Sequence, residues 1–316
     1  MDPISKALER AKQEGQSVRD WVRPGATPAA PVTPEQTPVQ AISSKARIKL
    51  DQRHLSSQML LSSTTDEDPV VTDRYRLLRT RVLQLMRANG WRSLGVTSPG
   101  AKAGKTVTSI NLAFSVAREG NYQIALIDAD IRKPSAAQYM GIENDLGLPD
   151  FLENGAELED VWLDVSAPAQ LSFVSGESSS GMRPAPDVLK SERMTQLINF
   201  ATQASDNHLV IIDLPPALIG DDVLAVSAHL DALLIVVDES STKTDDLKQT
   251  VELLSECNIL GTVLNKSTEK PKKDPGYYQY QYHYNVEDSD DAQQDTNEID
   301  SDADDSSEPT TKSNAG

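Results

Sequence analysis

Residues 93–120 constrain the fold of this chain more than any other segment, and they read SLGVTSPGAKAGKTVTSINLAFSVAREG. A short run that ends at Thr97 is typical of a strand, and small residues make up the loop that follows. Apolar residues then recur at the three- and four-residue spacing of a helix, which Gly120 is expected to end. A strand, a glycine-containing loop and a helix in this order predict a loop that binds phosphate.

The chemistry of phosphate binding explains the residue types in this loop. Small side chains leave backbone amides free to donate to phosphate oxygens, and the helix N-terminus adds partial positive charge. Lys105 is expected to reach the β- and γ-phosphates of a nucleotide, and the Thr106 hydroxyl to bind Mg²⁺. A strict G-x4-G-K-[ST] match would have glycine where this chain has Pro99, so an ordinary strand-to-helix turn is the alternative. The loop residues expected to bind nucleotide are Gly100, Ala101, Lys102, Ala103, Gly104, Lys105, Thr106 and Val107.

The chain on either side of the loop alternates between strand and helix patterns. Helical spacing occupies 73–89, 105–119, 189–204 and 243–256, and the expected strands are 94–97, 124–128, 171–174, 209–213, 232–237 and 261–264. Several of these strands are continuous apolar runs, as in a parallel sheet that is covered on both faces. We therefore predict an α/β fold of the P-loop NTPase type for residues 71–268, with a mostly parallel sheet flanked by helices.

The two ends of the chain differ in composition from its middle. Residues 1–22 begin with a short helical pattern, and residues 23–70 read as a linker that is rich in proline over 23–40 and irregular after that. Residues 269–316 form a tail with little to bury, in which 286–316 hold eleven acidic residues against one lysine. We expect both the N-terminal linker and the tail to be disordered.

Composition also excludes several classes of function. The net charge of −18 argues against nucleic acid as the main ligand. The longest apolar run, 232–237, is too short to cross a bilayer, and no signal peptide follows the N-terminus, so we expect a cytoplasmic protein. The single cysteine excludes a disulfide framework, and the four histidines lack the spacing of a zinc site.

Acidic residues follow two of the expected strands. Asp128 ends one strand and Asp130 lies two residues later, while Asp213 ends another strand before two prolines. Ligands of doubly wound sheets bind at the carboxyl ends of the strands, so these carboxylates should lie beside the phosphate loop. Mg²⁺ prefers oxygen ligands, and one carboxylate could accept a proton during phosphoryl transfer. Arg132 and Lys133 follow directly and are either further phosphate ligands or a solvated turn.

A tyrosine cluster is the second unusual feature of the sequence. The segment YYQYQYHY contains Tyr277, Tyr278, Tyr280, Tyr282 and Tyr284 in a polar region that has no core in which to bury them. The acidic residues nearby disfavour stacking on nucleic-acid bases. A tyrosine-rich tether on a phosphoryl-transfer domain indicates that the tail is the substrate of the enzyme.

These motifs together resemble a known family, the bacterial tyrosine autokinases of capsule and exopolysaccharide synthesis, and within it the cytoplasmic exosortase-associated branch. The resemblance covers about residues 70–284 and rests on TSPGAKAGKT, LIDADIRKP, IIDLPP, PDVLKSERMTQLI, GTVLNK and the terminal tyrosines. It implies an ATP- and Mg²⁺-dependent enzyme that phosphorylates its own tail tyrosines and regulates polysaccharide synthesis or export.

The resemblance also implies roles for particular residues. Lys105 and Thr106 would bind ATP with Mg²⁺, Asp128 would be the base, and Asp130 and Asp213 would serve the metal. Asn265 and Lys266 match the residues on the adenine side of the site, and Asp73, Arg76 and Arg79 match an element that assembles subunits into a ring. The implied partners are a membrane-embedded activator of the chain-length-determinant type, which recruits the kinase to the inner face of the plasma membrane, and a tyrosine phosphatase.

Two alternative functions remain open at the level of sequence. The loop contains Ala101, Lys102 and Ala103 where the autokinases commonly have Pro-Gly-Glu, which leaves room for a nucleotide-gated scaffold without catalysis. A partitioning-type ATPase is the other alternative, although those proteins carry an additional lysine where this chain has Gly100.

Overall fold

The computed structural model describes residues 47–61, 68–167, 170–179, 186–203 and 207–268. The helix expected within residues 1–22, the proline-rich segment 23–40 and the tail 269–316 lie outside these described residues, and so does the tyrosine cluster.

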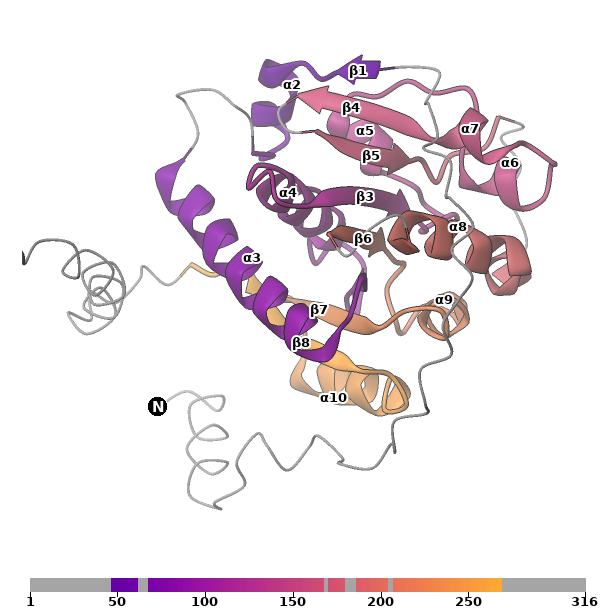
Figure 1. The fold of residues 1–316 in the computed structure, drawn as a ribbon. Helices are drawn as coiled ribbons and strands as arrows, with labels where there is room; N and C mark the ends of the chain where they lie inside the picture. The colour runs from indigo at the N-terminus through magenta and orange to yellow at the C-terminus, as the bar shows by residue number, and fades with distance from the viewer. Residues whose placement is uncertain (1–46, 62–67, 168–169, 180–185, 204–206, 269–316) are drawn as a thin grey trace, which may run out of the picture.

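A mixed sheet forms the centre of the described structure (Figure 1), and its eight strands lie in the order β1-β4-β5-β3-β6-β2-β7-β8. All neighbouring strands are parallel except β4 and β5, which pair antiparallel. The strands are β1 (Arg47–Lys49), β2 (Ser93–Thr97), β3 (Gln123–Asp128), β4 (Leu163–Ala167), β5 (Leu171–Val174), β6 (His208–Asp213), β7 (Ala232–Asp238) and β8 (Ile259–Asn265). This arrangement confirms the expected α/β class, and each of the six expected strands is present.

Helices cover both faces of the sheet. Cores on one face include residues of α2, α3, α4 and α5, and those on the other include residues of α6 to α10 and of a 3₁₀ turn. The helical elements are α2 (Gln52–Ser57), α3 (Pro69–Asn89), α4 (Lys105–Ala117), α5 (Ala136–Met140), α6 (Leu148–Leu152), α7 (Leu158–Val161), η2 (Pro186–Lys190), α8 (Glu192–Gln203), α9 (Asp222–Ser227) and α10 (Thr244–Leu253). Within the described parts of the chain, none of them has both the length and the apolar character needed to cross a bilayer.

Successive residues of the central strands pack in the hydrophobic cores on opposite faces of the sheet. In β3, Ile124 and Leu126 pack on the α4 side, whereas Ala125 and Ile127 pack on the α8 side. Strand side chains alternate between the two faces of a sheet, so a strand covered on both faces needs an apolar residue at every position. The continuous apolar runs in the sequence have this cause.

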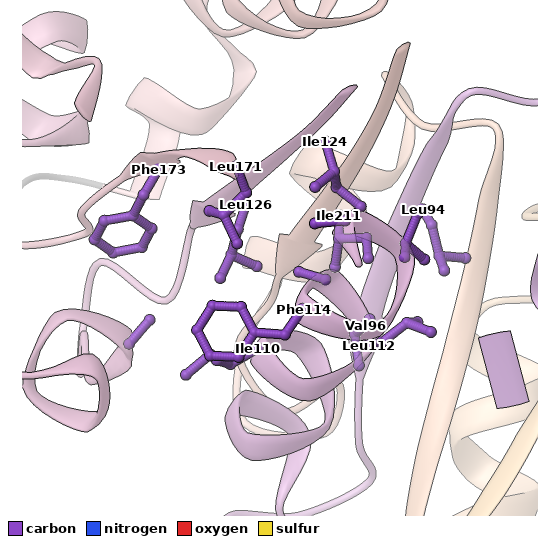
Figure 2. Packing of buried hydrophobic residues seen from close by; sticks show 14 of the residues in the cluster. Leu94, Val96, Ile110, Leu112, Phe114, Ile124, Leu126, Leu171, Phe173 and Ile211 are labelled. Atoms are coloured by element: carbon purple, nitrogen blue, oxygen red, sulfur yellow. The ribbon is translucent and has the colours of Figure 1, made fainter. Parts of the chain in front are cut away.

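Helix α4 lies between the sheet and α3, and nearly all of its residues are buried. Figure 2 shows Phe114 of this helix among side chains that include Ile110, Leu126 and Phe173. Asp68 caps α3 by accepting a hydrogen bond from the backbone of Val70, and α3 ends where Gly90 adopts φ 70°. The burial of α4 between α3 and the sheet fixes the position of the helix that follows the phosphate loop.

The structure corrects the expectation that residues 41–70 are an irregular linker. Residues 47–61 contain β1 and α2, and they bury Leu50, Leu55, Leu60 and Leu61. The backbone of Leu61 donates to Asn111 Oδ1 of α4 at 2.7 Å. The ordered unit thus begins at least as early as residue 47. A segment this short has too few residues to show a period, and its order comes from contacts with distant parts of the chain.

Candidate active site

Three strands converge at the expected phosphate loop. The order β3-β6-β2 places the carboxyl end of β6 between those of the other two, with Asp128 opposite Asp213 in register. Asp213 also pairs with Val96, just before the loop begins. Since carboxyl ends of parallel strands meet at one edge of the sheet, the acidic residues lie beside the loop, as the sequence predicted.

Lys105 is the first residue of α4, and it is buried among carboxylates. Its Nζ atom lies 2.9 Å from Asp130 Oδ2 and 3.6 Å from Asp213 Oδ2. Burial of the ammonium opposes its charge, but Asp213 and Asp130 outweigh this effect and raise the pKa of Lys105. The lysine therefore keeps its positive charge at the point where phosphate oxygens are expected.

Hydroxyl groups of α4 bind the carboxylate of Asp213. Thr106 Oγ1 donates to Asp213 Oδ2 at 2.6 Å, and Ser109 Oγ donates to Asp213 Oδ1 at 3.2 Å. Burial raises the pKa of Asp213, and the nearby ammonium of Lys105 opposes that rise. Ser109 had not been singled out from the sequence, although its position one helical turn after Lys105 places it on the same side of α4.

Asp128 has a different environment from the other two aspartates. It is fully buried, and its oxygens accept hydrogen bonds from the backbone of Asp130 at 3.1 Å and of Ser135 and Ala136 at 2.9 Å each. Burial, reinforced by the charge of Asp213, raises the pKa of Asp128 to about 7. Asp128 thus holds the loop that follows β3, and the pKa of its carboxyl group lies near neutral pH.

The residues of this site suit Mg²⁺ in the form in which phosphate-binding proteins hold it. The donor set consists of oxygens alone: the Thr106 hydroxyl and the carboxylates of Asp130 and Asp213. Among the described residues, no group of three or more His, Cys, Asp or Glu side chains forms a cage for a metal. Mg²⁺ usually retains several waters and takes further ligands from phosphate, so a few protein oxygens are sufficient.

Asn265 and Lys266 lie against the phosphate loop. Asn265 Nδ2 donates to the carbonyl of Ala103 at 2.9 Å, and Lys266 Nζ donates to the carbonyl of Lys102 at 2.6 Å. Lys266 also pairs with Asp238 at 2.8 Å, a buried residue that sequence reasoning missed although it ends an apolar strand in the same way as Asp128 and Asp213. The expected contact of Asn265 and Lys266 with adenine stays a prediction.

The other expected binding residues occupy varied environments. Gly100, Ala101 and Lys102 are exposed on the loop, whereas the half-buried Val107 side chain packs against the core that contains residues of α3 and α4. Arg132 Nε lies 2.8 Å from Asp222 Oδ2, an ion pair that links the loop after β3 to α9.

The three residues expected to join subunits do not share one environment. Asp73 and Arg76 form an exposed ion pair of 3.0 Å within α3. Arg79 is largely buried, donates to the carbonyl of Ser115 at 3.0 Å and lies 3.3 Å from Glu119 Oε2. Arg79 therefore ties α3 to α4 inside the subunit, and its role in assembly stays a prediction.

Comparison with known proteins agrees with this geometry. Residues 91–290 match the ParA family, described as NUBPL iron-transfer P-loop NTPase. The chain is 30% identical over 233 residues to the putative tyrosine-protein kinase EpsB of Ralstonia nicotianae, a match that covers 72% of this chain and 29% of EpsB. It is 28% identical over 217 residues to the tyrosine-protein kinase YwqD of Bacillus subtilis, which covers 68% of this chain and 89% of YwqD.

A solved structure supports the same fold. The kinase domain of the Escherichia coli tyrosine kinase ETK superposes with a TM-score of 0.57 at 23% identity, covering 72% of this chain and 93% of that domain. The chain spans less than a third of the length of EpsB, so the similarity there concerns a single region of a longer protein. The family match agrees with the sheet order and with the cluster of Lys105, Asp130 and Asp213 beside the loop. The chain belongs to the ParA-type family of P-loop NTPases.

Proposed function

We propose that this protein is an ATP-dependent protein-tyrosine autokinase that regulates the synthesis or export of an exopolysaccharide. The observation that carries the proposal is the convergence of Lys105, Thr106, Asp130 and Asp213 at one edge of the sheet. The similarity to proteins named tyrosine-protein kinases selects phosphoryl transfer to tyrosine from the reactions that such a site supports.

The proposed acceptors are the tyrosines at 277, 278, 280, 282 and 284. A phenol oxygen attacks the γ-phosphorus in line, the bond to the β–γ bridging oxygen breaks, and ADP leaves. Lys105 neutralises charge on the phosphate oxygens, and the loop amides orient them. Bound Mg²⁺, held through Thr106, Asp130 and Asp213, would neutralise further phosphate charge. The phenol proton passes to a carboxylate of the site.

Asp128 is the proposed acceptor of that proton, with Asp130 as the competing candidate. A base works best when its pKa lies near the working pH, and the pKa of Asp128 is raised to about 7. Asp130 lies closer to the loop lysine, to which its Oδ2 atom is bound at 2.9 Å. The two candidates differ in their consequences, because a labelling rate that rises through about pH 7 and loses this rise in Asp128→Asn is expected only if Asp128 is the base.

The proposed setting follows the resemblance to capsule-type autokinases. Unphosphorylated subunits assemble into a ring through the α3 region of Asp73, Arg76 and Arg79, and a membrane-embedded activator recruits them to the inner face of the plasma membrane. A tyrosine phosphatase reverses the modification. The exposed ion pair of Asp73 and Arg76 supports such a contact because both side chains remain accessible on α3.

The test is incubation of the full chain with Mg²⁺ and γ-labelled ATP, alone and with an activator fragment. Two variants accompany it: Lys105→Met, and a chain truncated after Lys270, which lacks all five tail tyrosines. We expect label on tyrosine in the intact chain and in neither variant. Lys248→Met removes an exposed lysine of α10 and serves as the matched control.

Other outcomes would select other functions. Nucleotide binding without any label, with or without activator, would support a nucleotide-gated scaffold. Release of inorganic phosphate without label on protein would support a partitioning-type ATPase. Label that persists after truncation would move the acceptor tyrosine out of the tail.

A further inference from the structure

Two side chains from the end of β8 bind the backbone of the phosphate loop on its carbonyl side. Lys266 Nζ lies 2.6 Å from the oxygen of Lys102, and Asn265 Nδ2 lies 2.9 Å from the oxygen of Ala103. These are consecutive carbonyls, immediately before Gly104 and Lys105. The sequence separation exceeds 160 residues, so the contact is a product of the tertiary fold.

Peptide geometry makes these carbonyl contacts relevant to ligand binding. In a planar trans peptide the N–H of one residue points opposite to the C=O of the residue before it. Fixing the oxygens of Lys102 and Ala103 therefore fixes the N–H groups of Ala103 and Gly104 in the opposite direction. Among the described residues, no hydrogen bond involves either of these amides as a donor. Both are thus free to donate to an anion.

The loop needs such external support because its backbone is strained. Lys102 has φ 65° and Gly104 has φ 91°, both in the left-handed region, which is costly for a residue with a side chain such as Lys102. The approach of β8 is also close, since a Cβ atom added to Gly104 would lie 2.2 Å from Asn265 Nδ2. Lys266 itself has φ 56°, so strained backbone occurs on both sides of the contact.

Asp238 at the end of β7 holds the lysine in place. Its Oδ2 atom lies 2.8 Å from Lys266 Nζ, while Oδ1 accepts hydrogen bonds from Ser240 N at 2.9 Å and Ser240 Oγ at 2.7 Å. The ammonium of Lys266 is the main cause that holds the pKa of Asp238 well below its usual range. β7 and β8 are hydrogen-bonded neighbours that pair Asp238 with Asn265, so the carboxylate, the ammonium and the amide form one rigid unit.

We propose that Asp238, Lys266 and Asn265 are positioning residues that hold the phosphate loop in the shape that binds the phosphates of a nucleotide. Lys266 acts through the loop carbonyl, and Asp238 acts through Lys266. This role differs from the contact with adenine that the family resemblance implies for Asn265 and Lys266. It requires nucleotide binding but no kinase activity, so it stands or falls separately from the proposed function.

Affinities of the full chain for two probes test this inference. The probes are ADP with Mg²⁺, and inorganic tripolyphosphate with Mg²⁺, which has no base. For Lys266→Met we expect both affinities to fall about tenfold or more, because a charge-assisted hydrogen bond to the loop is lost. Asp238→Asn should show a smaller fall of the same kind, and Lys266→Arg should restore part of the loss. Lys248→Met is the control, since its lysine pairs only with Asp245 on the surface of α10 among the described residues.

Hydrogen exchange supplies a second readout that general destabilisation would not move. With ADP and Mg²⁺ at saturation, we expect Lys266→Met to speed exchange at the amides of Ala103 and Gly104, which bound phosphate should protect, while the amides of β2 and α4 keep their protection. A fall in ADP affinity with unchanged tripolyphosphate affinity would overturn the inference in favour of a contact with adenine. Unchanged affinity for both probes would overturn it as well. Should Lys266→Met fail to fold, Asn265→Ala tests the neighbouring carbonyl contact in the same way.

Discussion

Replacing Lys105 with methionine should destabilise the protein in a manner that depends on pH. The substitution keeps most of the side-chain volume and removes the ammonium from Asp130 and Asp213. The side chain of Asp213 is fully buried and that of Asp130 is 7% exposed, so water cannot replace the lost charge. Breaking a buried ion pair by removal of one partner costs about 3–5 kcal/mol.

The direction of the pH effect follows from linkage. Burial already raises the pKa of Asp213, and loss of the lysine raises it further. A carboxyl group with a raised pKa in the folded state stabilises that state only when protonated, so its contribution is lost as pH rises through the folded pKa. We expect the variant to lose about 3 kcal/mol of unfolding free energy at pH 8 and about 1 kcal/mol at pH 5, because protonation relieves the repulsion at acidic pH.

Urea denaturation of both proteins at pH 5, 6.5 and 8, with linear extrapolation to water, measures these differences. The double variant Lys105→Met with Asp213→Asn should recover much of the stability lost at pH 8, since the uncompensated carboxylate is then absent. Lys248→Met should leave stability unchanged at each pH, because exposed pairs contribute little. A deficit that is the same at pH 5 and pH 8, or one that grows toward acidic pH, would refute the assignment of Lys105 as the countercharge of a desolvated cluster.

Three further predictions concern the phosphate loop, the proposed proton acceptor Asp128 and helix α3. Gly104→Ala should reduce ADP affinity at least tenfold in calorimetry with native circular dichroism, because φ 91° and the approach of Asn265 exclude a Cβ atom; unchanged affinity would contradict the observed loop. In the intact chain the rate of tyrosine labelling should rise with pH through about 7 as Asp128 ionises, and Asp128→Asn should slow labelling at least a hundredfold and remove this dependence; a variant with the same pH profile would favour Asp130. Arg79→Ala should lower the free energy of unfolding by about 1–2 kcal/mol through loss of its contacts with α4, whereas Arg76→Ala should alter only assembly in sedimentation velocity; equal stability of the two variants would contradict this separation.

Much of the architecture was predictable because its signals are local. A strand buried on both faces needs continuous apolar residues, and an amphipathic helix needs apolar residues at its own period. Each of the six expected strands and four longer helices is present with boundaries shifted by a few residues. The largest helix shift is in α3, which begins at Pro69 because Asp68 supplies the cap. The edge strand β1 and its neighbour β4 were not predicted, since three and five residues with partial exposure carry little periodic signal.

Part of the candidate site could likewise be predicted from the sequence. Residue type and position after a strand were enough to name Lys105, Thr106, Asp128, Asp130 and Asp213, because the carboxyl ends of parallel strands meet at a common edge. The sequence also indicated the tyrosine-rich tail as a candidate substrate, which lies outside the described residues.

Only the tertiary structure decided which partner each of several polar side chains takes. It placed Arg79 against α4 and joined Asp238 to Lys266, and it brought Lys266 to the phosphate loop across 164 residues of sequence. A local pattern determines the backbone conformation of an element and the face that it buries. The partner of a polar side chain depends on which elements the completed sheet brings together, and that information is distributed over the whole chain.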